Sequence, residues 1–428
     1  MADNTNNTLK NSVIYSIYVR NYGENGNFKD VEKDLKRIED IGVDIIWLMP
    51  IHPIGVKNKK GLLGCPYAIK NYREVNPEYG TLEDFKDLID SIHSLGMKCI
   101  IDVVYHHTSP DSYLSEVYPE YFYKKADGSF GNKVGDWSDI IDLDYSNKKL
   151  WDYLIDTLKY WVSIGVDGFR CDVASLVPLE FWIKAREEVS KINKDTIWLA
   201  ESVHQSFIRE IRKAGFIAHS DCELYRAFDI CYDYDVNEEY INYLDGKGRL
   251  DSYIEKVRQQ ETIYPSNYIK LRFLENHDQP RIASKIKDIE LLKTWTKFMY
   301  FQKGTTLLYN GQESMETHTP SLFDIDKIRI KNQNEELTDL MQKLYEIKKL
   351  DIIRDGFYDI NIIPNTEVVI ASYTSDTDKI IGIFNLSENT YEVNLENGKY
   401  LNIIDNEEIN ISNGKINLTK NGFILKEI

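Results

Sequence analysis

Two short stretches define the fold: Lys98-Cys-Ile-Ile-Asp-Val-Val-Tyr-His-His107 and Gly168-Phe-Arg-Cys-Asp172. Each contains an apolar run of strand length that ends in polar residues. Between them, apolar residues recur at three- and four-residue spacings from Leu154 to Trp161, which indicates an amphipathic helix. A strand, a helix and a second strand in this order predict two parallel strands whose carboxyl ends meet at one edge of a sheet.

The same alternation of Val- and Ile-rich runs with amphipathic segments continues over the first three quarters of the chain. It predicts eight strands: Val13 to Val19, Asp44 to Met49, Lys98 to Val104, Gly168 to Cys171, Ile197 to Glu201, Arg226 to Ile230, Leu271 to Leu274 and Thr306 to Tyr309. Eight strands joined by helical crossovers are typical of a parallel sheet closed into a barrel. We therefore predict an α/β fold with a (β/α)8 TIM barrel.

Two segments interrupt this alternation. Residues 105–144 are rich in Tyr, Asp, Gly and Ser, and a loop of this length is usually functional or a small subdomain. Residues 351–428 contain neither Trp nor His, and their alternating runs between Asn, Gly and Ser turns indicate an antiparallel β domain. The predicted organisation is a catalytic barrel (1–104 and 145–350, closed by a helix from Glu335 to Lys349), an inserted loop-rich domain after strand three (105–144) and a C-terminal β-sandwich-like domain (351–428).

Composition excludes several classes of partner. The 428 residues include 52 Lys and Arg against 69 Asp and Glu, a formal charge of −17, which argues against nucleic acid because phosphate binding depends on Lys and Arg. No apolar stretch approaches the roughly 20 residues that span a bilayer, so we expect no membrane segment. The polar start of the chain lacks a secretory pattern, and five cysteines cannot all pair. We therefore expect free thiols and a cytoplasmic protein.

Charged residues gather where the predicted strands end, which is where catalytic groups collect in a parallel barrel. Strands four, five and seven lead to Asp172, Glu201 and Asp278. Like charges repel at close range, so three converging carboxylates cost stability and indicate a catalytic site that uses them. Arg170 lies two residues before Asp172, on the same side of an extended strand, and is expected to hold it ionised. Glu201, next to apolar Trp198 to Ala200, is expected to keep its proton near neutral pH.

These segments resemble the signature motifs of the alpha-amylase family, glycoside hydrolase family thirteen. The four signatures correspond to Asp102-Val-Val-Tyr-His-His107, Gly168-Phe-Arg-Cys-Asp172, Glu201 with its apolar strand, and Asn276-His-Asp278. Ancillary motifs agree at Tyr67-Ala-Ile-Lys-Asn-Tyr72, Asp139-Ile-Ile-Asp-Leu-Asp144 and Gly311-Gln-Glu313. The resemblance covers essentially the whole chain, and the motifs occur in the order of the family.

The resemblance implies a retaining glycoside hydrolase in which Asp172 is the nucleophile and Glu201 the general acid and base. Asp278 would be a third carboxylate that binds sugar hydroxyls. Such an enzyme needs its nucleophile and acid about 5 to 5.5 Å apart, which neighbouring barrel strands can supply. The resemblance also implies a set of substrate-binding residues: Tyr67, which stacks on the sugar, the hydroxyl-binding His107 and His277, and Arg170.

The leading interpretation is a double-displacement hydrolase of α-1,4-glucosidic bonds in starch-derived glucans or maltodextrins, of the alpha-amylase type. An exo-acting α-glucosidase and an α-glucan transglycosylase use the same chemistry and stay open. A third interpretation is a non-catalytic barrel that binds sugar or serves as a transporter accessory subunit. Evidence against it is the presence of all four charged residues, Asp172, Glu201, Asp278 and Arg170. The motifs separate neither endo from exo action nor one chain length or linkage from another, and they leave the oligomeric state open.

Several features depart from the family pattern or stand outside it. The family usually has a calcium-binding Asn where this chain has His106, and imidazole suits Ca²⁺ poorly, so we predict no metal ligands and no required cofactor. His106 and His107 should point to opposite sides of a strand. Ser175-Leu-Val-Pro178 stands where many endo-amylases have a Lys-His pair. The acidic residues from Asp221 to Glu239 are expected to form a solvated rim.

Overall fold

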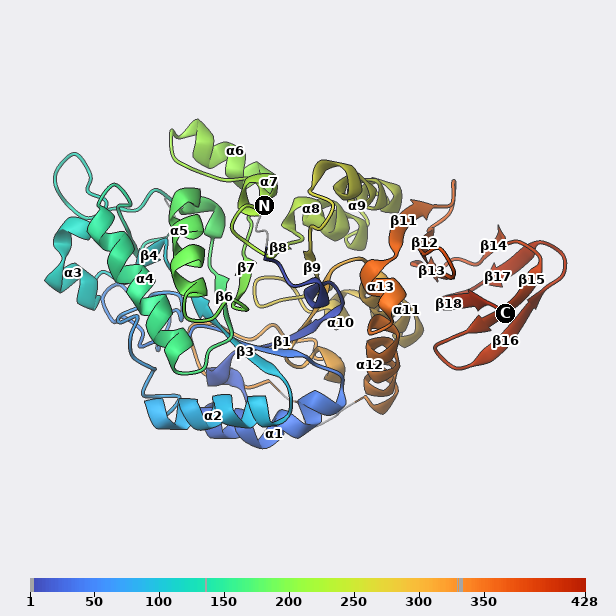
Figure 1. The fold of residues 1–428 in the computed structure, drawn as a ribbon, viewed down its shortest axis with the longest axis horizontal. Helices are drawn as coiled ribbons and strands as arrows, with labels where there is room; N and C mark the ends of the chain where they lie inside the picture. Colours follow the sequence, from blue (N-terminus) through green and yellow to red (C-terminus); the bar gives the residue numbers. More distant parts are fainter. Residues whose placement is uncertain (1–3, 135–136, 329, 331–333) are drawn as a thin grey trace.

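The computed structural model describes residues 4–134, 137–328, 330 and 334–428. Within them, eight parallel strands close into a barrel in the order β1-β10-β9-β8-β7-β6-β3-β2, which confirms the predicted TIM barrel (Figure 1). These strands are β1 (Val13–Ile17), β2 (Ile45–Leu48), β3 (Lys98–Val103), β6 (Gly168–Cys171), β7 (Ile197–Ala200), β8 (Ile230–Tyr232), β9 (Lys270–Arg272) and β10 (Thr305–Tyr309).

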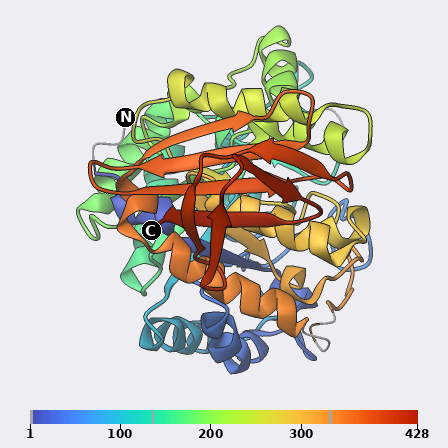
Figure 2. The same cartoon turned by 90° about the vertical axis from the view of Figure 1, so that its right-hand side faces the viewer.

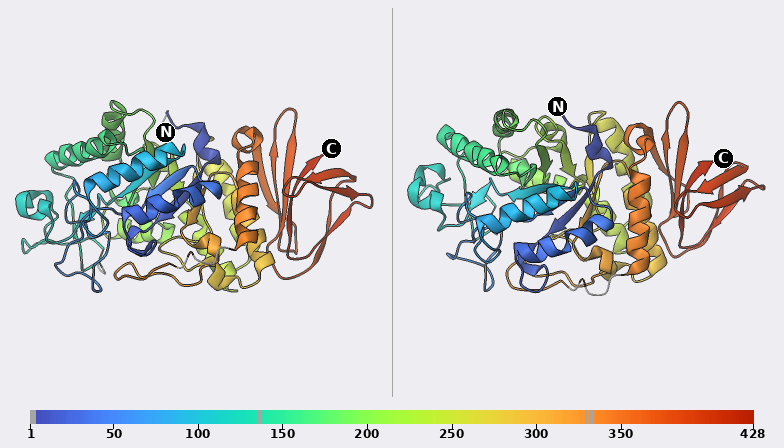
Figure 3. Two further views of the ribbon diagram at one scale, coloured as in Figure 1. Left: turned by 90° about the horizontal axis from the view of Figure 1, so that it is seen from below. Right: turned by 60° about the horizontal axis from the view of Figure 1, so that its bottom comes forward.

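Helices surround the barrel, as the views in Figure 3 show. They are α1 (Phe28–Asp40), α2 (Leu82–Ser94), α4 (Lys148–Ser163), α5 (Leu179–Ser190), α6 (Gln205–Lys213), α7 (Asp221–Leu224), α8 (Tyr234–Leu244), α9 (Leu250–Ile263), α10 (Ile282–Lys285), α11 (Ile289–Phe301) and α12 (Glu335–Lys348). α2 shows why such segments become helices: a capping box between Thr81 and Asp84 starts it, and Phe85, Leu88 and Ile92 are buried. Among the described residues, no helix is long and apolar enough to cross a membrane.

The prediction for the sixth strand was wrong. The predicted segment, Arg226 to Ile230, is mostly the turn after α7, and the strand β8 begins at its last residue. Ser220 and Glu223 form a capping box that starts α7, and the amide of Phe228 still bonds to the carbonyl of Leu224. The local helix signal therefore prevails, and the apolar Phe228 packs beside Trp182 of α5 instead of extending the sheet.

The acidic segment from Asp221 to Glu239 is not a solvated rim, because Asp221, Asp233 and Asp235 are buried. Two cations on β9 neutralise them. Lys270 pairs with Asp221 and with Asp235, and Nη1 of Arg272 lies 2.8 Å from Oδ2 of Asp233. Buried carboxylates need such partners. The partners lie in another strand of the barrel, so the acidic segment read alone gave no sign of them.

The inserted segment contains α3 (Tyr113–Val117) and a small antiparallel pair, β4 (His107–Thr108) with β5 (Ile141–Asp142). The prediction that His106 and His107 point to opposite sides was wrong. Their Nδ1 atoms lie 3.1 Å apart, with the ring planes at 83°. Side chains alternate only along a continuous strand, whereas β3 ends at Val103 and β4 begins at His107. The turn between them brings the two rings together.

The C-terminal part is an antiparallel β domain, as predicted, at the opposite end of the molecule from α3 (Figure 1), and it faces the viewer in Figure 2. A six-stranded sheet has the order β11-β12-β13-β18-β15-β16, and β14 pairs with β17. Phe384 of β13 packs on Phe298 and Phe301 of α11 and so joins this domain to the barrel. The elements are α13 (Asp351–Asp355), β11 (Phe357–Ile362), β12 (Val368–Thr374), β13 (Lys379–Asn385), β14 (Tyr391–Asn394), β15 (Gly398–Asn402), β16 (Glu407–Ile411), β17 (Lys415–Leu418) and β18 (Gly422–Glu427).

Candidate active site

Arg170 is the centre of the charged cluster at the carboxyl edge of the barrel. Its guanidinium is fully buried on β6 and contacts three carboxylates. Nη1 lies 2.8 Å from Oδ1 of Asp172 and 3.0 Å from Oδ1 of Asp102, and Nη2 lies 3.0 Å from Oε2 of Glu201. The neighbouring strands β3, β6 and β7 thus deliver their acidic residues to one cation.

Asp102 is a member of this cluster that the sequence analysis did not assign. It stands opposite Arg170 in the register of β3 with β6, and its Oδ2 accepts a hydrogen bond of 3.1 Å from the hydroxyl of Tyr67. Burial raises the pKa of Asp102 to about 7, although Arg170 opposes the shift. The signal was a charged residue inside an apolar run. Asp102 holds both Arg170 and Tyr67 in place.

The pKa values of the two central carboxyls are shifted in the same direction. Burial raises the pKa of Glu201 to about 8 and that of Asp172 to about 7, and in both cases the positive charge of Arg170 acts against the shift. Arg170 was expected to hold Asp172 ionised. It shares its charge among three carboxylates, so burial outweighs it and the pKa of Asp172 lies above its usual range. The expected order is kept, since Glu201 binds its proton more tightly.

The chain turns sharply directly after Asp172. Val173 has φ 36° and ψ 44°, a left-handed conformation that costs a β-branched residue about 1–3 kcal/mol. In this conformation its backbone N–H donates a hydrogen bond of 2.7 Å to Oε2 of Glu201. The turn after β6 therefore orients the carboxyl group at the end of β7.

A cavity of about 370 Å³ lies above this cluster. Asp172 and Glu201 are nearly buried at its base, whereas the side chain of Asp278 is 41% exposed. Arg170 lies beneath the base and does not line the cavity. The structure thus brings six of the seven predicted residues to one surface: Tyr67, His107, Asp172, Glu201, His277 and Asp278.

The two histidines of the cavity are neutral near neutral pH, because burial lowers the pKa of His107 and of His277 to about 4. A neutral imidazole can donate one hydrogen bond and accept another, which matches a sugar hydroxyl. Nε2 of His277 lies 2.8 Å from the hydroxyl of Tyr67, and the two rings are stacked with centroids 5.6 Å apart. These contacts fix His277 and the Tyr67 ring relative to each other.

The remaining wall of the cavity was not predicted. Trp137, Phe207 and Tyr234 supply aromatic surface, and His204 stacks on Tyr234 with ring centroids 4.3 Å apart. Their segments do not share a sequence pattern that could have singled them out. Aromatic faces of this kind suit the apolar C–H face of a sugar ring.

A salt bridge connects two sides of the cavity. Nζ of Lys60, in the loop after β2, lies 2.9 Å from Oδ1 of Asp139 in the inserted segment, and both residues line the cavity. Asp139 belongs to a motif that the sequence analysis noted, but its partner was not predicted. The bridge joins two loops that are far apart in the sequence.

The residues around His106 do not fit a calcium ion. Its nearest acidic oxygen is Oδ2 of Asp142, 3.7 Å from Nε2, whereas Ca²⁺ takes six to eight oxygen ligands. Burial lowers the pKa of His106 well below its usual value, so it presents a neutral ring nitrogen. Within the described part of the chain, no group of three or more His, Cys, Asp or Glu residues could hold a metal ion. Independence from calcium stays a prediction.

A closed parallel barrel whose carboxyl edge gathers carboxylates, neutral histidines and aromatic rings in one cavity defines the class of protein, a glycoside hydrolase. The family model described as alpha amylase, catalytic domain, matches residues 3–130 and 134–359, and that of the bacterial alpha amylase C-terminal domain matches residues 359–425. The chain therefore belongs to the alpha-amylase family.

Individual proteins similar to this chain include alpha-amylases and a maltosyltransferase. The crystal structure of an alpha-amylase from Lactobacillus plantarum has 45% sequence identity and a TM-score of 0.95, covering 99% of this chain and 100% of that one. A maltogenic alpha-amylase from Thermotoga neapolitana has 34% identity and a TM-score of 0.88, covering 98% and 99%. An alpha-1,4-glucan:maltose-1-phosphate maltosyltransferase of Picrophilus torridus is 24% identical over 87% of this chain. The match spans 60% of the length of that relative.

Proposed function

We propose that the protein is a retaining hydrolase of α-1,4-glucosidic bonds in starch-derived glucans or maltodextrins, of the alpha-amylase type. The observation that carries the proposal is one buried guanidinium, Arg170, in contact with both Asp172 and Glu201 at the carboxyl ends of adjacent strands. The raised pKa of Glu201, about 8, supports its role as a proton donor.

In the proposed mechanism, a carboxylate oxygen of Asp172 attacks the anomeric carbon while the bond to the leaving oxygen breaks. Glu201 gives its proton to that oxygen. Glu201, now ionised, then takes a proton from water, whose oxygen displaces Asp172 from the anomeric carbon. Two inversions give net retention. Asp278 and the neutral His107 and His277 would bind the hydroxyls of the sugar at the cleaved bond.

Glu201→Gln tests the acid and base. The amide cannot transfer the proton, so we expect kcat on maltoheptaose to fall about 10²- to 10⁴-fold with the fold intact by circular dichroism. The matched control is Glu210→Gln on the exposed face of α6, which should leave kcat unchanged. NMR of the first products should show the α anomer. Unchanged cleavage by Glu201→Gln, or an initial β anomer, would refute the mechanism.

The alternatives are an exo-acting α-glucosidase and an α-glucan transglycosylase. Both form the same covalent intermediate, but an exo enzyme binds only a chain end and a transglycosylase resolves the intermediate with a sugar hydroxyl. The products therefore separate them. Chromatography of maltoheptaose digests over time should show mixed short oligomers for the proposed endo action. Glucose alone would indicate an exo enzyme, and products longer than the substrate a transglycosylase.

We also propose that the protein acts in the cytoplasm. Cys99, Cys171 and Cys231 are buried free thiols, and Cys65 and Cys222 are also unpaired, which supports a reducing compartment. Fractionation of cells that make the protein naturally tests this, and its recovery from the culture medium would contradict it.

A further inference from the structure

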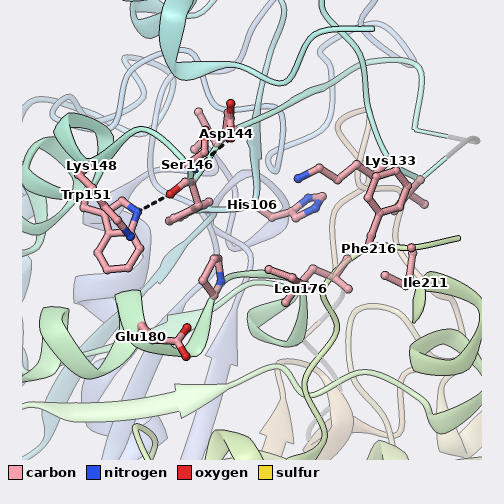
Figure 4. A pocket seen from close by; sticks show the side chains of 16 residues that line it. His106, Lys133, Asp144, Ser146, Lys148, Trp151, Leu176, Glu180, Ile211 and Phe216 are labelled. Carbon is pink, nitrogen blue, oxygen red and sulfur yellow. Dashed lines mark hydrogen bonds between the residues drawn. The ribbon is translucent and has the colours of Figure 1, made fainter. Parts of the chain in front are cut away.

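A second cavity, of about 540 Å³, is lined by His106 and is drawn in Figure 4. Its walls come from the inserted segment, from the first turns of α4 and α5 and from the chain after α6. Among the described residues it shares no lining residue with the catalytic cavity. His106 lines the second cavity and His107 the first, although their Nδ1 atoms lie only 3.1 Å apart, so the two rings stand between the cavities.

One wall of the second cavity is apolar. Leu176, Ile211 and Phe216 point toward the space between them in Figure 4. Phe216 is half-buried, and the neighbouring Ile217 is 53% exposed. The hydrophobic cluster that holds this wall also contains Val173 and Val203, which line the catalytic cavity. The same hydrophobic cluster therefore packs beneath both cavities, and the apolar wall of the second cavity faces an unfilled space.

The other wall is polar and carries both signs of charge. Lys133 and Lys148 are balanced by Asp144 and Glu180, and His106 is neutral because burial lowers its pKa. In the described part of the chain, the carboxylate of Glu180 has no hydrogen bond or ion pair. The hydroxyl of Ser146, also on this wall, has no hydrogen-bond partner there either. The exposed Ser146 hydroxyl and Glu180 carboxylate are thus free to meet a ligand, whereas Nζ of Lys148 lies 3.2 Å from the ring centroid of Trp151 and Nζ of Lys133 lies 6.0 Å from that of Phe216.

The apolar wall and the polar wall of the second cavity together favour one chemical class of ligand. An anion would meet the carboxylates of Asp144 and Glu180, and a purely apolar ligand would displace water from the exposed Ser146 and Glu180 without replacing its hydrogen bonds. A neutral sugar has hydroxyls that both donate and accept at its edge and C–H groups on its face. The edge matches the polar wall and the face matches Phe216 and Leu176. A volume of about 540 Å³ is within the usual range of small-ligand sites.

We propose that this cavity is a second binding site for a short neutral oligosaccharide, separate from the catalytic cavity. The ligand class rests on the proposed function, because a glucan-cleaving enzyme meets such oligosaccharides as substrates and products. Phe216 supplies the apolar platform, and Glu180 accepts hydrogen bonds from sugar hydroxyls.

Calorimetric titration of the Glu201→Gln variant with maltotriose tests the proposal, since this variant should not consume the ligand. Two sites per chain are expected. Adding Phe216→Ala or, in a separate variant, Glu180→Gln should weaken binding at one site at least tenfold and leave the other unchanged. Phe357→Ala, which truncates a Phe that is 74% exposed on β11, is the matched control and should keep both sites. Thermal melting identifies any variant that loses its fold.

Each outcome has a distinct meaning. A single site that survives both Phe216→Ala and Glu180→Gln overturns the second site and leaves the proposed function standing. Two sites that both survive these changes overturn the placement in this cavity. Absence of any maltotriose binding would count against the proposed function itself.

Discussion

At the scale of single residues, the charge balance of the site depends on Arg170. One guanidinium faces Asp102, Asp172 and Glu201, so three negative charges meet one positive charge when all three carboxyls are ionised, and bound protons are required to lower the excess. Burial strengthens this requirement, because desolvation disfavours the charged form of each carboxyl. A proton therefore stays bound to the cluster near neutral pH. It is bound most tightly by Glu201, the proposed acid, because the pKa of Glu201 is higher than that of Asp172.

This balance predicts the pH dependence of the free enzyme. Activity needs Asp172 ionised and Glu201 protonated, so kcat/KM should rise with pH through about 7 and fall through about 8. Because Asp172 and Glu201 interact, the rising and falling limbs of the pH profile report pKa values of the pair and not of either residue alone. Asp102→Asn removes a negative charge that raises the pKa of Asp172, so the acid limb should move to lower pH. Asp87→Asn on the exposed face of α2 is the control, and an acid limb unmoved by Asp102→Asn would contradict the account.

The chemistry of His106 predicts the response to chelation. Because His106 presents a neutral imidazole, which suits Ca²⁺ poorly as a ligand, we expect EDTA to leave kcat and the melting temperature essentially unchanged. Both are measured before and after dialysis against the chelator. Complete loss of activity that added calcium restores would show that other groups hold the ion.

At the scale of elements, loops rather than strands shape the cavity above the carboxylates. β6 and β7 set the positions of Asp172 and Glu201 through their register. The loop after β2 and the inserted segment approach each other across the cavity and are tied by Lys60 and Asp139. Loops on a rigid barrel are the usual place for differences in specificity. We therefore expect the salt bridge between Lys60 and Asp139 to limit which part of a glucan chain can enter the catalytic cavity.

Lys60→Met tests this role, because it keeps a long apolar stem and removes the charge that joins the loops. We expect a wider cavity and longer first products from maltoheptaose, with cleavage itself retained. Lys57→Met, an exposed position in the same loop, is the matched control. Product chromatography decides the matter, and identical product patterns for the two variants would exclude the bridge as a determinant.

At the scale of the whole molecule, the barrel and the C-terminal domain form a continuous packed structure. Phe384 is fully buried on β13, with ring centroids 5.6 Å from Phe298 and 5.7 Å from Phe301. In Figure 1 the C-terminal domain lies at the end of the long axis beyond α11 and α12, whereas β6 and β7, whose ends lead to Asp172 and Glu201, lie on the other side of these helices. We therefore expect the C-terminal domain to affect activity only by stabilising the fold of the barrel.

Phe384→Ala should lower the free energy of unfolding by about 3–5 kcal/mol, the usual cost of truncating a buried Phe. All the tryptophans lie before residue 296, so tryptophan fluorescence in urea reports on the barrel, while circular dichroism reports on both parts. We expect both midpoints to fall, because the ring packs on α11. The exposed Phe357→Ala should change neither. An unchanged fluorescence midpoint in Phe384→Ala would show that the domain does not stabilise the barrel.

Local sequence signals were enough to predict the eight-stranded barrel, the insertion, the β domain and three carboxylates at one edge, whereas the resemblance to a family was needed for Tyr67, His107 and His277. Hydrophobic periodicity sets each element, and strand ends place Asp172, Glu201 and Asp278 at one edge. Only the folded chain revealed the sharing of Arg170 with Asp102, the pairing of buried Asp221 with Lys270, and the Lys60 bridge. Each of these joins residues distant in the chain. A charge acquires its pKa and role from groups that folding brings within a few ångströms, and no local pattern records them.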